Sequence, residues 1–113
     1  MALTEARRTG DFILSEANGT RSREEVTIAA AAGAMIPGTV VSMLASGKYV
    51  EYDDVGTDGT EVAAGILYAA VADSASDQKA VIIVRDAEVN ASRLTGSNAN
   101  AVADLRALGI IAR

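Results

Sequence analysis

The sequence contains no cysteine and no histidine, and these two absences exclude several kinds of chemistry. Without cysteine there is neither a disulfide framework nor a thiolate metal site. Without histidine the chain lacks the commonest general base and the commonest zinc ligand. Serine and threonine hydroxyls are plentiful, but no histidine is present to activate one as a nucleophile. The composition therefore predicts a protein that is not an enzyme and needs no cofactor.

Large apolar side chains are also scarce. The chain has no Trp, three Tyr and a single Phe, whereas alanine is its commonest residue. A chain of 113 residues forms one domain with a modest core. Small side chains remove less apolar area from water for each residue that is buried. We therefore expect the fold to depend partly on contacts between subunits.

Charge and hydropathy narrow the choice of partners. The formal net charge of −5 disfavours a protein that follows the phosphate backbone of a nucleic acid. No run approaches the roughly 20 apolar residues of a membrane span. Arg7 and Arg8 are not followed by an apolar stretch of signal-peptide length. We expect a chain that is soluble and intracellular when made, with neither nucleic acid nor membrane as a partner.

Short β-favouring runs separated by turn residues occupy the middle of the chain. Residues 38–44, 47–52 and 62–72 are rich in Val, Ile and Tyr, and Gly/Asp/Ser clusters lie between them. Such spacing predicts antiparallel strands joined by short loops. Gly65 interrupts the third run, which indicates a bulge or a close approach of another backbone. A fourth run, residues 80–84, has the highest β propensity in the chain.

The C-terminal part changes to helical spacing. Val102, Leu105 and Leu108 fall on one stripe, with Asn98 as the N-cap and Gly109 at the position of a left-handed C-terminal residue. A last short strand is expected after the glycine. The predicted fold is mainly β, a small β-barrel or sandwich with one short C-terminal helix.

Residues 1–25 form a separate compositional zone. Their charges nearly cancel, and one tripeptide of large apolar residues, Phe12-Ile13-Leu14, stands alone in a polar, glycine-punctuated stretch. Such a segment buries too little by itself to offset its ordering entropy. We therefore divide the chain into a flexible N-terminal arm, residues 1–25, and a β-rich domain, residues 26–113. The arm is interpreted either as a frayed terminus or as a segment that becomes ordered on a partner.

The Asp53–Asp58 loop is the one candidate for a metal site. Its aspartates and glycines partly match a calcium loop, but Gly56 and Gly65 stand where that pattern requires a polar ligand and a bidentate glutamate. Asp-Gly pairs also make turns without any metal. Two alternative functions stay open at this point: a small β-barrel metal-binding domain or enzyme subunit that uses this loop, and a β-rich adaptor.

Six segments in this order and spacing resemble the head decoration proteins of tailed bacteriophages, the family of the phage lambda capsid-stabilising protein. The segments are Gly10–Glu16, Ser22–Thr27, Pro37–Val40, Gly47–Val50, Ala64–Leu67 and Val84–Val89. The resemblance implies a capsid decoration protein that binds the outside of the phage head as a homotrimer and stabilises the expanded capsid. It also implies an N-terminal arm that adds a strand to the major capsid protein.

The same resemblance implies a location for the protein and a site on the chain. The protein would be made in the host cytoplasm and would lie on the outer capsid surface of the virion. Its partners would be other copies of itself and the major capsid protein. In this sequence we assign the capsid-binding arm to Phe12, Ile13, Leu14, Arg21 and Arg23.

Overall fold

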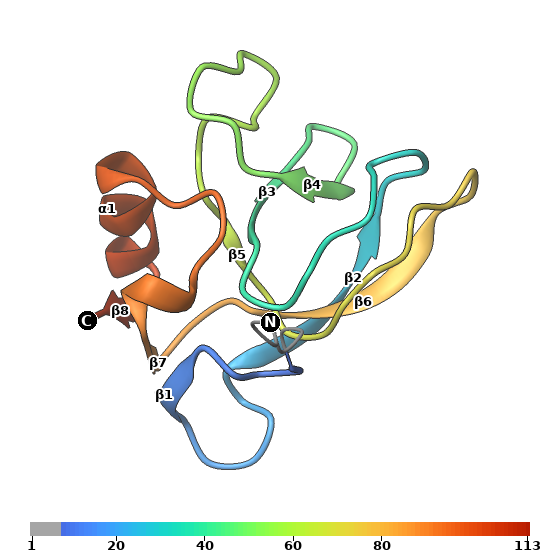
Figure 1. The fold of residues 1–113 in the computed structure, drawn as a ribbon. Helices are drawn as coiled ribbons and strands as arrows, with labels where there is room; N and C mark the ends of the chain where they lie inside the picture. The colour runs from blue at the N-terminus through green and yellow to red at the C-terminus, as the bar shows by residue number, and fades with distance from the viewer. Residues whose placement is uncertain (1–7) are drawn as a thin grey trace, which may run out of the picture.

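The computed structural model describes residues 8–113, and Figure 1 shows their arrangement. In chain order the elements are β1 (Ile13–Glu16), β2 (Arg23–Ile28), β3 (Val40–Met43), β4 (Tyr49–Glu51), β5 (Gly65–Leu67), β6 (Gln78–Ile83), β7 (Ala87–Val89), the 3-10 helix η1 (Ala91–Arg93), α1 (Ala99–Ala107) and β8 (Ile110–Ala112). The predicted fold class, mainly β with one short C-terminal helix, is confirmed.

Five of these strands close into a barrel in the order β2-β4-β3-β5-β6. The runs predicted as strands in residues 38–72 supply β3, β4 and β5, and the run at residues 80–84 overlaps β6. β2 pairs with β6 along its whole length, from Arg23 opposite Ile83 to Ile28 opposite Gln78. At Gly65 a Cβ atom would lie 2.7 Å from the carbonyl oxygen of Ile83. The close backbone approach predicted at this glycine is therefore confirmed.

A second, three-stranded sheet has the order β1-β7-β8. In Figure 1 this sheet and α1 lie on one side of the barrel, with β1 beside the start of β2. Asn98 is the N-cap of α1, and its side chain accepts a hydrogen bond from the amide of Ala101; Gly109 follows the helix with φ of 86°. Both helix-end predictions are confirmed. Within residues 8–113 no helix is both long and apolar enough to cross a bilayer.

The core consists of two clusters of buried side chains. One cluster lies within the barrel and is made of Val26, Ile28, Met35, Val41, Leu67, Val71 and Ile82. The other joins the barrel to the second sheet and to α1, and is made of Phe12, Val40, Tyr52, Ala63, Ile66, Ile83, Ala87, Val89, Ala101, Leu105 and Ile110. Because the second cluster takes residues from both ends of the chain, it holds the N-terminal and C-terminal segments against the barrel.

Candidate functional site

The apolar tripeptide assigned to the capsid-binding arm is divided between core and surface. Phe12 is fully buried, Ile13 is half-buried against the same core cluster, and Leu14 is 55% exposed. The expectation of a free arm over residues 1–25 therefore needs correction for the part that the structure describes. The physical reason is that Phe12, the single phenylalanine, packs in the core cluster that joins the barrel, the second sheet and α1. Residues 1–7 of the predicted arm lie outside the described residues.

Backbone hydrogen bonds also hold this segment in place. The amide of Asn90 donates to the carbonyl of Phe12 at 2.8 Å, and the amide of Gly10 donates to the carbonyl of Tyr68 at 2.9 Å. β1 then runs antiparallel to β7, with a register irregularity between Ile13 and Ser15. The segment from Gly10 to β1 is therefore part of the folded body.

β1 is the end strand of its sheet. Because the sheet order is β1-β7-β8, one edge of β1 pairs with β7, and the other edge has no strand partner among residues 8–113. Leu14 is exposed on this strand. An unpaired edge with an exposed apolar side chain presents the groups that a further strand would bind.

The two arginines assigned to the site differ in their environment. Arg23 forms an ion pair with Glu16 at 2.5 Å, and its guanidinium lies 4.1 Å from the centroid of the Tyr68 ring. The hydrogen bond to Glu16 is the main cause that raises the pKa of Arg23 above its ordinary value. Arg21 is exposed, and its carbonyl accepts a hydrogen bond from Arg85 at 2.7 Å. Arg23 therefore fastens β1 to β2, while Arg21 lies at the surface.

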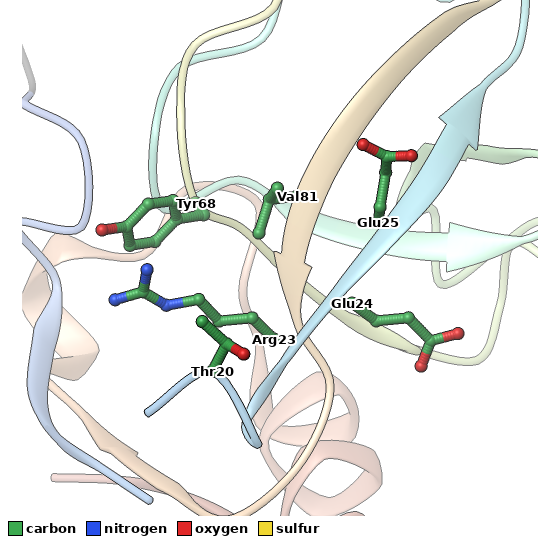
Figure 2. Close-up of a pocket in the computed structure, with 6 residues that line it drawn as sticks. All are labelled: Thr20, Arg23, Glu24, Glu25, Tyr68 and Val81. Carbon is green, nitrogen blue, oxygen red and sulfur yellow. The ribbon is translucent and has the colours of Figure 1, made fainter. Parts of the chain in front are cut away.

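A surface hollow of about 270 Å³ lies beside this arginine. Figure 2 shows the residues that line it: Thr20, Arg23, Glu24, Glu25, Tyr68 and Val81. The hollow was not predicted, because its lining comes from three separate parts of the chain. It lies on the outer face of the β2–β6 pair.

The Asp53–Asp58 loop uses its carboxylates to hold turns. Asp53 accepts from the amide of Val55 at 3.2 Å, and Asp58 accepts from the hydroxyl of Thr60 at 2.7 Å. The hydrogen bonds that Asp58 accepts from the hydroxyl and the amide of Thr60 lower the pKa of Asp58. Asp54 accepts from the side-chain amide of Asn98 at 2.6 Å. Within residues 8–113 no group of three or more acidic, histidine or cysteine side chains is placed to hold a metal ion, so the metal-binding alternative gains no support.

A carboxylate on β7 also fastens β1. Glu88 accepts a hydrogen bond from the hydroxyl of Ser15 at 2.8 Å and is paired with Arg113. The pKa of Glu88 lies below its ordinary value of 4.5, mainly because of the hydrogen bond from Ser15 and next because of Arg113. A carboxyl group whose pKa is lowered by folding stabilises the fold above its unfolded pKa, and this contribution is lost as the pH falls through the folded pKa.

The attachment of β1 to β7 is therefore expected to weaken as the pH falls below 4.5. Hydrogen exchange of the β1 amides, corrected for intrinsic exchange rates, would measure this as a loss of protection. The Glu88→Gln variant is the control, because its side chain does not titrate and its loss on acidification should be smaller. An equal loss of protection in the variant and the wild-type protein would contradict this assignment.

The family model of the bacteriophage lambda head decoration protein D matches residues 2–110. This match covers almost the whole chain. The chain belongs to the head decoration protein D family. Among curated proteins, none matches the chain closely enough to count as a relative.

Membership of the head decoration family has three direct consequences. It associates the chain with a phage capsid, it locates the protein on the virion, and it makes the chain a structural protein. The resemblance inferred from the six sequence segments is thereby confirmed. The hydrogen bonds at the start of α1 then have a structural role. Asn98 accepts from the hydroxyl of Tyr52 and donates to Asp54, and these two bonds fix the helix against the barrel.

Proposed function

We propose that this head decoration protein acts as a homotrimer that binds the outside of the phage head and stabilises the expanded capsid. In this proposal the N-terminal segment adds a strand to a sheet of the major capsid protein. The protein is made in the host cytoplasm and has no catalytic role. The family match supports the capsid as the partner, and it covers the N-terminal segment as well as the barrel.

The observation that carries the strand-addition step is the position of β1. It is an end strand with one unpaired edge among the described residues, and Leu14 is exposed on it. A strand of the capsid protein that pairs with this edge gains main-chain hydrogen bonds, each of which contributes about 0.5–1.5 kcal/mol. Because Phe12 and β1 are already ordered in the body, little entropy of these residues is lost on binding.

Trimerisation supports tight binding by linking three contacts. Once the first subunit is bound, the other two bind at a high effective concentration if their spacing matches the sites on the shell. Contacts that are individually weak are then sufficient for stable attachment. A chain with few large apolar residues also gains buried surface from contacts with its own copies.

Light scattering of the purified protein and co-sedimentation with phage shells test this proposal together. We expect the mass of three chains in solution, and binding to expanded shells that then resist heat better than bare shells. A stable monomer that decorates shells equally tightly would contradict the trimer. A protein that neither binds expanded shells nor stabilises them would contradict the function as a whole.

A further inference from the structure

The hollow on the outer face of the β2–β6 pair has an apolar floor. Glu25 on β2 lies directly opposite Val81 on β6, so both side chains project from the same face of the barrel. The amide of Tyr68 donates to the carbonyl of Val81 at 3.0 Å, which places the tyrosine beside that pair. In Figure 2 the Tyr68 ring lies over the guanidinium of Arg23, Val81 lies between this ring and Glu25, and Glu24 points away from them.

The charges around the hollow leave one carboxylate available. Arg23 is neutralised by Glu16 at 2.5 Å, and Glu24 is paired with Arg85 at 3.0 Å. Glu25 is exposed and forms no ion pair or hydrogen bond with any side chain in residues 8–113. The nearest lysine on the same face, Lys79, donates to the hydroxyl of Thr27 at 3.0 Å. An apolar floor with a free carboxylate at its rim suits a cation on an aliphatic stem.

We propose that this hollow receives a lysine or arginine side chain of the phage shell protein. The aliphatic stem lies on Tyr68 and Val81, and the cationic end pairs with Glu25. An anionic group is disfavoured because the guanidinium of Arg23 already binds Glu16. This inference rests on the proposed function, since it names a contact through which the decoration protein recognises the shell.

The location of the hollow favours the shell over a second copy of this chain. Gly10 packs closely against the Tyr68 ring, because a Cβ atom added at Gly10 would lie 2.9 Å from Cε1 of the ring. The hollow therefore borders the segment that leads into β1, whose free edge the proposed function assigns to the shell. A basic shell side chain in the hollow and a shell strand on β1 would form one continuous contact.

The test compares Glu25→Lys with Asp73→Lys in co-sedimentation with expanded shells over a range of salt concentrations. Both variants make the same change in charge at an exposed carboxylate, but Asp73 lies beyond the Gln78 end of β6. We expect Glu25→Lys to weaken binding about tenfold or more, because the loss is repeated in each subunit of the trimer. Asp73→Lys should bind as the wild-type protein does, and both variants should keep the wild-type melting temperature.

Four outcomes would overturn this inference. Equal weakening by the two variants would show that only the overall charge matters. Wild-type binding by Glu25→Lys would show that the hollow does not contact the shell, although the proposed function would stand. If Glu25→Lys alters the mass of the free protein, the occupant is a second copy of the chain. If the wild-type protein does not bind shells, both the proposed function and this contact are wrong.

Discussion

Replacing Phe12 with alanine is expected to lower the free energy of unfolding by about 3–5 kcal/mol. Phe12 is fully buried and packs in the cluster that contains Leu105 and Ile110, so its removal leaves a cavity in that cluster. The loss is large compared with the roughly 5–15 kcal/mol that stabilises a typical domain. Chemical denaturation at one fixed protein concentration would measure it, because association contributes to the stability of an oligomer.

Leu14→Ala is the matched control for this prediction. Leu14 belongs to the same apolar tripeptide but is 55% exposed, so its replacement should change the unfolding free energy by no more than about 0.5 kcal/mol. The two substitutions therefore separate a core residue from a surface residue only two positions away. If Phe12→Ala unfolds at the same denaturant concentration as the wild-type protein, Phe12 does not pack in the core, and a free arm over residues 1–25 is again the better description.

Two deletions in the N-terminal segment are expected to have different consequences. Removing residues 2–7 takes away no strand or helix of residues 8–113, so these elements should still fold. Removing residues 2–16 takes away Phe12 and all of β1, which uncovers β7 and one core cluster. The longer deletion should therefore unfold at a much lower temperature or fail to fold. A deletion through residue 25 would also remove the half of β2 that pairs with residues 81–83 of β6.

The shorter deletion is the informative one for capsid binding. If the N-terminal segment contributes to the contact with the shell, the protein without residues 2–7 should fold normally but bind expanded shells at least about tenfold more weakly, because the trimer loses three contacts together. Full binding by this variant would confine the shell contact to the folded body. Wild-type stability of the longer deletion would contradict the place of β1 in the fold.

The strands β3 to β6, the last strand β8 and the helix could be predicted because their signals are local. Each of these signals depends on only a few neighbouring residues. They are the β-favouring runs, Asn98 before the helix and Gly109 after it. Gly65 could be recognised for the same reason, since a glycine within a buried strand indicates a close backbone approach. These predictions needed no knowledge of how distant segments meet.

The role of Phe12 could not be predicted, because its partners come from the far end of the chain. In the sequence its tripeptide stands alone among polar residues, whereas in the fold Leu105 and Ile110 pack in the same cluster. The hollow was missed for a related reason. It requires the register that sets Glu25 opposite Val81, and a one-residue shift in that register would turn one of the two side chains to the opposite face.

Electron microscopy of expanded phage shells mixed with this protein would show the proposed attachment to the shell. We expect added density on the outer surface at the threefold and quasi-threefold positions, with three copies of the barrel at each position. The β1 edge and the hollow beside Tyr68 should both face the shell. Bare shells, or isolated single copies attached through another face of the barrel, would contradict this mode of attachment.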